Sequence, residues 1–447
     1  MEHSAATHRA VLSDDAVTKM MSFLEPTEDR KAFLTCKTWS TCWRRRCRGL
    51  LRVVGQRIGR FPNVTHVSPH GGGVVVSNYD DNSLEAYSPE GRGAVHVATY
   101  VFSRPREEID DAEGLGNFHL PSVMALRGDG TAWVILGDDF ADLACVRLGA
   151  TVSEQTATEQ CEPIMKIDFS ELPEDHALFG FLPVDLALAG DRLLVLCCGP
   201  EDAHFGRVQV LDNQTGALLH NFGTTCENWQ MSCENWRGEP PENWQDELRK
   251  PSCLAVHEQY CFVADTHNQA VKVFDWRDGT LVRAFGQHQE GSWAAKELMQ
   301  HWTPGGGYAT VPYYKFGNDY YDAYRKGYGP GAFITPCGIA VRDGRLYVSE
   351  LEGRRIQVFR LPDDMRGSDL NLRPRLSMTS MELLQTIPSP DGWPLGGLCF
   401  DDAGRLWCVG PGVTWMGPNA NHAFKFDTTI HFDDPDAYLH VFEPCCR

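Results

Sequence analysis

The apolar residues of this chain fall into short runs that are separated by glycine-containing turns in a repeating order. The segment that begins at Pro251 has a short apolar strand, a turn, a second apolar strand ending at Asp265, and an alternating strand over 271–274. Short apolar runs bounded by turn residues predict buried strands, and alternation predicts a strand with two different faces. The segment that begins at Pro336 follows the same order, with Glu350 at the end of its second strand.

Weaker copies of this unit extend the pattern over most of the chain. The first strand of each copy follows an anchoring proline, and these prolines are Pro62, Pro121, Pro183, Pro251, Pro336 and Pro394. The spacing leaves room for four strands in each copy, and repeated four-stranded units are typical of a β-propeller. In the last copy we expect Phe424–Phe426 to be the third strand and Tyr438–Phe442 to be the final one. The sequence leaves open whether Arg52–Val54 or the C-terminus closes the ring.

Two of the copies carry a family resemblance. Val-Ala-Asp-Thr-His-Asn over 263–268, followed by Val-Lys-Val-Phe over 271–274, resembles the NHL repeat, and so does 336–341 together with 355–359. The resemblance implies a six-bladed NHL-type propeller, which agrees with the count of prolines. Because Asp265 and Glu350 occupy equivalent positions, we expect both to have a structural role and to bond backbone amides in the turn.

The first 50 residues have a helical pattern instead. Ser13-Asp14-Asp15 is a helix start, because a capping hydroxyl precedes acidic residues in the first turn. Val17, Met20, Met21 and Leu24 then form one apolar stripe at helical spacing, and Pro26 ends the helix. A second helix is expected from about Thr27–Asp29, and a third over the stretch with Trp39 and Trp43. Three short helices cannot bury much core alone, so this unit depends on a partner or on a neighbouring domain.

These residues resemble an F-box over roughly 11–50. The resemblance lies in Leu-Ser-Asp-Asp over 12–15, Phe-Leu-Glu-Pro over 23–26 and Cys-Lys-Thr-Trp over 36–39, although Ser13 replaces the usual proline. It implies docking onto a Skp-type adaptor of a cullin ubiquitin ligase. The adaptor-binding residues that it implies are Leu12, Val17, Met20, Phe23, Leu24, Leu34 and Trp39. The alternative is a helical cap packed on the propeller. The expected domains are a disordered N-terminus over 1–10, the F-box-like unit over 11–50, a linker over 51–61 and the propeller over 62–447.

Two insertions interrupt the regular copies, at about 224–249 and about 288–334. The first repeats Glu-Asn-Trp three times, and the second is rich in Tyr and Gly. Long connections without a repeat pattern are uncommon unless they are functional or disordered, and Trp and Tyr are enriched in recognition surfaces. We therefore expect target-binding residues in both. They are Trp229, Trp236, Trp244, Tyr313, Tyr314, Tyr320 and Tyr321. For the first insertion the alternative is a recent duplication that lies against the barrel, and for the second it is a flexible insertion without a binding function.

Charge divides the chain in the same way as the hydrophobic pattern. Residues 1–60 have 12 basic and 6 acidic side chains, a net of +6, whereas the whole chain has a net of −19, which leaves −25 for the remainder. An acidic body repels phosphate, so nucleic-acid binding by it is disfavoured, and a basic target is favoured. No apolar run approaches the roughly 18 residues of a membrane span, and we expect no secretory signal because the first residues lack an apolar stretch. We expect an intracellular protein, cytoplasmic or nuclear, with no membrane partner.

Motifs for bond-breaking chemistry are missing. The sequence has no phosphate-binding glycine loop, no Gly-x-Ser-x-Gly and no His-Glu-x-x-His, and its 16 cysteines include no Cys-x-x-Cys. We expect structural thiols, no metal, no cofactor and no catalytic residues. The favoured function is therefore a non-catalytic substrate-recognition subunit of a Skp–cullin–F-box ubiquitin ligase. The alternatives are a propeller hydrolase or lyase with a metal in its channel, and a non-catalytic NHL scaffold.

Overall fold

The structure is a computed structural model. It describes residues 56–62, 64–70, 72–78, 83–90, 93–101, 122–136, 142–148, 158–160, 162–168, 181–199, 205–223, 248–266, 269–286, 298–302, 308–312, 331–351, 353–362, 365, 381–389, 395–410 and 436–442. The F-box-like unit predicted over 11–50 lies outside these residues.

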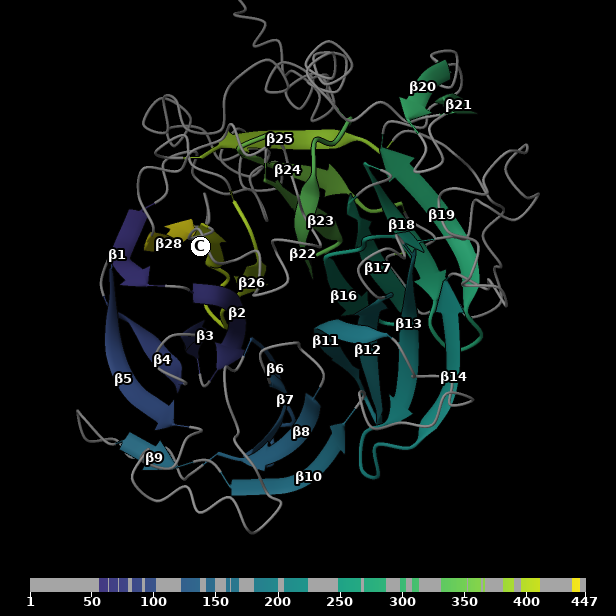
Figure 1. Ribbon diagram of the computed structural model, residues 1–447. Helices are drawn as coiled ribbons and strands as arrows, with labels where there is room; N and C mark the ends of the chain where they lie inside the picture. Colours follow the sequence, from purple (N-terminus) through teal and green to yellow (C-terminus); the bar gives the residue numbers. More distant parts are fainter. Residues whose placement is uncertain are drawn as a thin grey trace, which may run out of the picture.

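Six antiparallel sheets stand around a common axis and form a six-bladed β-propeller (Figure 1). Blade 1 contains β2 (Val64–His70), β3 (Gly73–Asn78), β4 (Ser83–Glu90) and β5 (Gly93–Val101), with the short β9 (Thr158–Gln160) parallel to β5. Blade 2 contains β6 (Val123–Leu126), β7 (Thr131–Leu136), β8 (Asp142–Arg147) and β10 (Glu162–Asp168). Blade 3 contains β11 (Leu182–Ala189), β12 (Arg192–Cys198), β13 (Phe205–Asp212) and β14 (Leu218–Gly223), and β15 (Leu248–Arg249) pairs with β13.

The remaining blades follow the same plan. Blade 4 contains β16 (Cys253–His257), β17 (Tyr260–Asp265), β18 (Ala270–Asp275) and β19 (Thr280–Gly286). Blade 5 contains β22 (Pro336–Arg342), β23 (Arg345–Glu350), β24 (Arg355–Arg360) and β25 (Leu383–Pro388). Blade 6 contains β26 (Leu398–Phe400), β27 (Leu406–Gly410), β28 (Asp436–Phe442) and β1 (Gln56–Pro62). The strands β20 (Leu298–Trp302) and β21 (Tyr308–Pro312) form a separate hairpin.

This arrangement confirms the predicted mainly β fold with six blades. The inner strands β2, β6, β16 and β26 begin two to four residues after an anchoring proline, whereas β22 begins at its proline and β11 begins one residue before it. The inner strands contact one another in sequence around the axis, and β26 contacts β2, so the ring is closed.

The ring closes through both ends of the described chain. β1 pairs antiparallel with β28, from Gln56 opposite Val441 to Pro62 opposite Asp436. Two expectations change as a result. First, most of the stretch expected to be a linker over 51–61 is a strand of the propeller. Second, Tyr438–Phe442, expected to be the final strand, belongs to β28, which pairs directly with β27 and is therefore the third strand of blade 6. Phe424–Phe426, expected in that place, lies outside the described residues.

The core consists of six apolar layers, each between two neighbouring blades. The second strand of blade 2 shows how they form. Val134 packs towards blade 1, whereas Trp133 and Ile135 pack towards blade 3. Because successive side chains of a strand point to opposite faces, a strand that is apolar at every position can fill two layers at once. This explains the unbroken apolar runs of the second strands.

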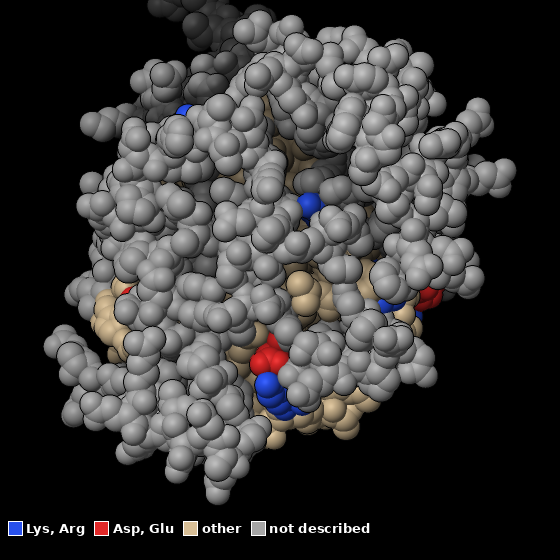
Figure 2. Space-filling model, viewed as in Figure 1, with Lys and Arg blue, Asp and Glu red and all other residues tan. Residues whose placement is uncertain are grey.

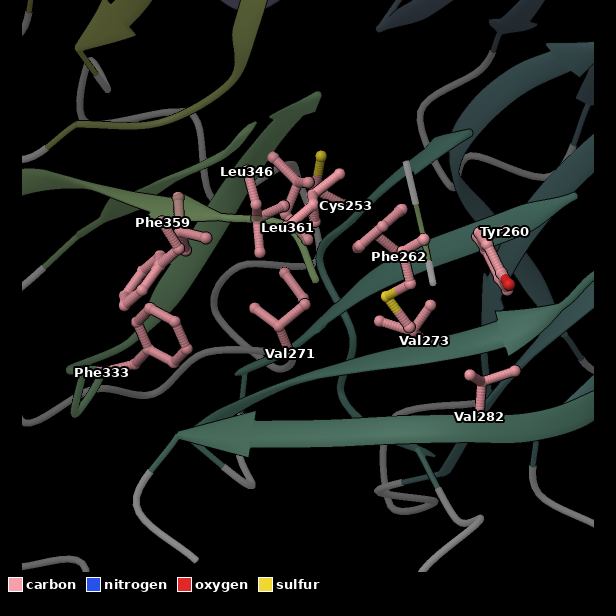
Figure 3. Packing of buried hydrophobic residues seen from close by; sticks show 14 residues of the cluster. Cys253, Tyr260, Phe262, Val271, Val273, Val282, Phe333, Leu346, Phe359 and Leu361 are labelled. Atoms are coloured by element: carbon pink, nitrogen blue, oxygen red, sulfur yellow. The ribbon is translucent and has the colours of Figure 1, made fainter. Parts of the chain in front are cut away.

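Figure 3 shows the layer between blades 4 and 5. Phe262 of β17 and Leu346 of β23 reach it from opposite sides, and Phe333 lies edge-on to Phe359 with ring centroids 5.5 Å apart. Such edge-to-face pairs contribute about 0.5–1.5 kcal/mol beyond the burial of their area. Phe333 belongs to the segment that leads into β22, so this layer also holds the start of blade 5.

Hydrogen bonds add specificity between the blades. The Ser68 hydroxyl of blade 1 donates to the Met124 carbonyl of blade 2 at 2.7 Å. The Trp133 indole of blade 2 donates to the Asn213 side-chain oxygen of blade 3 at 2.9 Å. These bonds fix the position of each blade along the propeller axis relative to its neighbour. Apolar contacts alone are not directional and do not fix that position.

Closure by β1 yields a prediction for truncated chains. A chain that begins at residue 63 lacks β1 and exposes the backbone groups of β28, whereas a chain that begins at residue 51 keeps the strand. We expect the shorter chain to unfold at a temperature lower by at least about 10 °C and to aggregate, because an open sheet edge pairs with other molecules. Differential scanning calorimetry and light scattering compare the two. Equal stability of the two truncations would show that β1 does not close the ring.

Candidate interaction face

The propeller has two faces that differ in the length of their connections. At one face the inner strands begin and the second strands end, as the pairs Val123–Ile135 and Cys253–Ala264 show. We call this the connection face, because the connections from the fourth strand of a blade to the next blade lie there. The opposite face carries the short turns between first and second strands, such as Gly190–Asp191, and we call it the turn face.

The ends of the described chain and its two long connections lie at different faces. Gln56 pairs with Val441, and Phe442 pairs with Leu406, the first residue of β27, so the chain leaves blade 6 on the turn-face side at both ends. The connections 224–247 and 287–330 both join a fourth strand to the next blade and therefore start and finish at the connection face. We call them the Trp-rich and the Tyr-rich connection.

The two ends of the Trp-rich connection are held side by side on β13. Gly223, the last residue of β14, pairs with Arg207, and Leu248 pairs with Gly206. Gly223 has φ +102°, which side chains rarely adopt, and a Cβ atom there would lie 3.1 Å from Leu248 Cδ1. The glycine therefore permits both the bend and the close approach of the returning chain.

The two ends of the Tyr-rich connection are held in an equivalent way one blade further on. Gly286, the last residue of β19, has φ +134°, and a Cβ atom there would collide with the carbonyl oxygen of Gln269 and lie 3.1 Å from the Phe333 ring. The side-chain oxygen of Gln269 accepts a hydrogen bond from the Thr335 N–H at 2.6 Å. Gln269 thus contacts the chain where it leaves blade 4 and where it reaches blade 5.

A buried carboxylate holds the returning end of the Tyr-rich connection. Glu350, which is fully buried, accepts hydrogen bonds from Arg355 at 2.8 Å, from Gln357 at 2.6 Å and from the Ile334 N–H at 2.9 Å. Arg355 and Gln357 also donate to the Ala332 carbonyl, at 3.0 and 2.7 Å. Burial raises the pKa of Glu350, and its bonds to Arg355 counteract this shift.

Asp265 has the corresponding position in blade 4 and pairs with Lys272 at 2.8 Å, with both side chains almost fully buried. The structural role expected for Asp265 and Glu350 agrees with this geometry, but the amide that Glu350 bonds differs from the one expected. Each carboxylate pairs with a cation of the third strand of its own blade, and the amide bonded by Glu350 belongs to Ile334 rather than to the turn.

Three polar side chains approach the axis from the inner strands. Asp185 accepts hydrogen bonds from the Leu186 N–H at 2.8 Å and from the Leu254 N–H of blade 4 at 2.6 Å. Its carboxylate also interacts with the Cys253 thiol and attracts the His66 imidazole of blade 1. A Cβ atom on Gly397 of blade 6 would lie 3.7 Å from His66 Nδ1.

The protonation of these groups follows from burial. Burial lowers the pKa of His66, and the Asp185 carboxylate opposes this effect. Burial raises the pKa of Asp185 and of the Cys253 thiol. At neutral pH the imidazole is neutral and Cys253 is a thiol, which is a weak nucleophile compared with a thiolate. The bonds of Asp185 to Leu186 and Leu254 join blade 3 to blade 4, which is a structural use of the carboxylate.

The described residues contain neither a cluster suited to a metal ion nor a disulfide. Among the residues that the structure describes, no group of three or more His, Cys, Asp or Glu side chains is placed to hold a metal ion. The eight cysteines within the described segments are all free thiols. Within those segments, no helix is long and apolar enough to span a bilayer.

The sequence-predicted binding residues lie outside the described segments. This holds for the adaptor-binding set Leu12, Val17, Met20, Phe23, Leu24, Leu34 and Trp39, and for the target-binding set Trp229, Trp236, Trp244, Tyr313, Tyr314, Tyr320 and Tyr321. The residues that hold the ends of the two long connections were not predicted from the sequence. A Phe-Gly pair at the end of two successive fourth strands, at 222–223 and 285–286, was the available signal.

Comparison with known proteins adds little beyond the fold. The chain matches no protein family and no curated protein at the sequence level. Solved structures to which it is similar include a luciferin-regenerating enzyme, at 11% identity and a TM-score of 0.47 over 87% of this chain and 95% of that one. Hydrazine synthase of Kuenenia stuttgartiensis (14% identity, 79% and 93%, TM-score 0.40) is another. The Cps50 (Swd1) β-propeller domain of Myceliophteria thermophila (8% identity, 80% and 82%, TM-score 0.40) is a third.

The buried ion pair of blade 5 can be compared with an exposed pair in the same blade. We expect Glu350→Gln to lower the free energy of unfolding by about 3 kcal/mol, because it leaves the Arg355 guanidinium without its counter-charge. Glu382→Gln removes the partner of Arg360 in a pair that is 48% and 61% exposed, and should cost less than about 1 kcal/mol. Urea denaturation measures both. A Glu350→Gln chain as stable as Glu382→Gln would contradict the anchoring role of Glu350.

The lowered pKa of His66 predicts a pH dependence of stability. The folded chain keeps the imidazole neutral, whereas the unfolded chain takes up a proton below its ordinary pKa of 6.5. Stability should therefore fall as the pH decreases from about 6.5 towards the lower pKa of the folded state. We expect His66→Gln to lose less stability than the wild type between about pH 7 and pH 5.5, as measured by thermal unfolding. Parallel curves for the two chains would refute this assignment.

Proposed function

We propose that this chain is the substrate-recognition subunit of a Skp–cullin–F-box type ubiquitin ligase, and that its propeller, of NHL type, binds a target protein. The observation that carries the proposal is the presence in one chain of an F-box-like sequence over 11–50 and of a closed six-bladed propeller that starts at Gln56. The propeller fold itself is compatible with a protein-interaction scaffold.

The covalent connection between residues 1–55 and the propeller supports a receptor with two binding units, one for the adaptor and one for the target. Residues 1–55 lead directly into β1, which is paired along its length with β28. Because residues 1–55 are covalently joined to a strand of the ring, a protein that binds them is tethered to a protein that binds the propeller. Such tethering raises the effective concentration of one bound protein at the other.

The mechanism requires no chemistry from this chain. A receptor of this kind places lysines of its target near a ubiquitin-loaded enzyme, and the gain in rate comes from proximity and orientation. The thiol state of Cys253 and the structural bonds of Asp185 fit a receptor that breaks no bond itself. A non-catalytic scaffold, with residues 11–50 packed as a cap on the propeller, is the second candidate, and the same experiment separates the two.

The test is the binding of the full-length chain to a purified Skp-type adaptor, measured by isothermal titration calorimetry. We expect binding by the wild type and a loss of affinity of at least about tenfold in Leu24→Asp, because a buried charge at the apolar stripe is costly. Ser22→Asp is the matched control, because residue 22 is two positions from both Met20 and Leu24 and therefore falls on the opposite side of a helix. It should bind like the wild type.

Thermal unfolding of the same variants completes the design. A receptor predicts that both variants keep the unfolding temperature of the propeller. A cap predicts no adaptor binding by any chain and a lower unfolding temperature for Leu24→Asp alone. That second pattern would refute the ligase proposal and leave a scaffold.

A further inference from the structure

The strand that closes the ring is attached to it by one ladder. Among the described strands, β1 is hydrogen-bonded to β28 alone, at the outer edge of blade 6. β28 itself is fixed on both sides, because Leu439 and Val441 pack in the layer towards blade 1 and Phe442 packs in the layer towards blade 5. β28 therefore offers a preformed edge that accepts β1 in one register.

The connection that joins β1 to the rest of the ring is very short. Only Asn63 lies between Pro62, the last residue of β1, and Val64, the first residue of β2. The other five connections from a fourth strand to the next first strand are longer, and the shortest of them, over 389–397, has nine residues. One intervening residue keeps the Cα atoms of Pro62 and Val64 within about 7 Å of each other. This hinge therefore allows few positions of β1 relative to blade 1.

Both ladders are irregular near the hinge. The pairing of β1 with β28 changes register between Arg57 and Gly59, and the pairing of β2 with β3 changes register between Val64 and Val67. Such bulges bend a strand and increase its twist. Pro62 fixes its own φ and holds the residue before it in an extended conformation. The closed ring therefore accommodates the hinge by bending the strands on either side, whereas an extended hinge would join β1 and β2 into one continuous arm.

We propose that β1 is exchanged between two copies of this chain, so that β1 of each copy pairs with β28 of the other copy and closes its ring. The residue pairs, from Gln56 opposite Val441 to Pro62 opposite Asp436, are then the same as within one chain. Each copy gives one strand and accepts one, so the dimer is symmetric and closed. The proposal needs only the fold and does not rest on the proposed function.

The balance between closure within one chain and exchange between two is set by effective concentration. The hinge determines the concentration at which β28 meets the β1 of its own chain, and a linker that barely spans its two sites lowers that concentration. Short hinge loops favour strand exchange for this reason. Exchange is expected while the chains fold, because β1 detaches only when the ring unfolds as a whole.

A second copy is the partner that this edge favours. It supplies a strand with the sequence and the register that β28 already accepts, whereas any other protein would have to displace β1. On the face shown in Figure 2, the charged side chains of the described residues occur as small separate groups rather than as one continuous patch. Charge on that face therefore marks no docking surface for a different partner.

The test uses two versions of the full-length chain that are produced in one cell, so that they fold together. One version has an N-terminal hexahistidine tag and p-benzoylphenylalanine in place of Phe61, and the other has an N-terminal Strep tag. Tandem affinity purification isolates mixed dimers, and irradiation links the residue at 61 to its neighbours. In the register of the structure, Phe61 lies opposite Ala437 of β28. We expect a linked product that carries both tags, with the link located by mass spectrometry in 436–442.

A longer hinge provides the second arm of the test. Insertion of Gly-Ser-Gly-Ser after Asn63 raises the effective concentration of β1 at β28 of its own chain. We expect it to lower the dimer fraction, measured by size-exclusion chromatography with light scattering, at least about fivefold. The matched control has the same insertion after Gly114, in the connection of 21 residues over 102–122. It should keep the dimer fraction within about twofold of the wild type, because added length matters little in a long connection.

A wild-type chain that yields no mixed dimer would overturn the proposal. So would a dimer whose fraction is unchanged by the hinge insertion, or one whose links join residue 61 to β28 within a single chain, because both results describe association through surfaces rather than through β1. No adaptor takes part in either arm. Failure of this proposal therefore leaves the ligase proposal standing, and loss of adaptor binding leaves this one standing.

Discussion

Every blade of this protein is a sheet with two apolar faces, and such a sheet is stable only between two similar sheets. Val134 and Trp133 are neighbours in β7, yet they fill different layers, and the same holds for the second strands around the ring. An open row of blades would leave one apolar face bare at each end. The pairing of β1 with β28 removes this problem, because it completes blade 6 and brings the last layer against blade 1. The stability of the whole ring therefore depends on a contact between its two most distant segments.

Closure of the ring also determines at which face of the propeller each connection starts and ends. Once the ring is complete, the register of each blade fixes which connections start at which face, and the chain has no freedom to change this. Buried polar groups then hold the Tyr-rich connection where it joins the ring. Gln269 and Glu350 bond the returning chain at Thr335 and Ile334, and Gly286 allows the departing chain to pass close to it.

The sequence predicted the parts of the fold that depend on local pattern. The apolar second strands, the turns such as Gly190–Asp191 and the prolines before the inner strands gave the six blades, because these features repeat. β1 was missed because its sequence has no clear alternation, and its position is decided by β28 at the far end of the chain. The partners of Glu350 were missed for the same reason, since Ile334 and Arg355 come together only in the folded blade. The F-box-like and aromatic binding residues stay predictions from the sequence, because they lie outside the described segments.

The central claim is that the pairing of β1 with β28 closes the ring and makes the six blades one cooperative unit. The most direct measurement is amide hydrogen exchange of the full-length chain, read by mass spectrometry for the peptides that contain β1 and β28. The account predicts that these two strands exchange together with the second strands of the blades, in one global unfolding. Exchange of β1 well before the rest of the ring would contradict it.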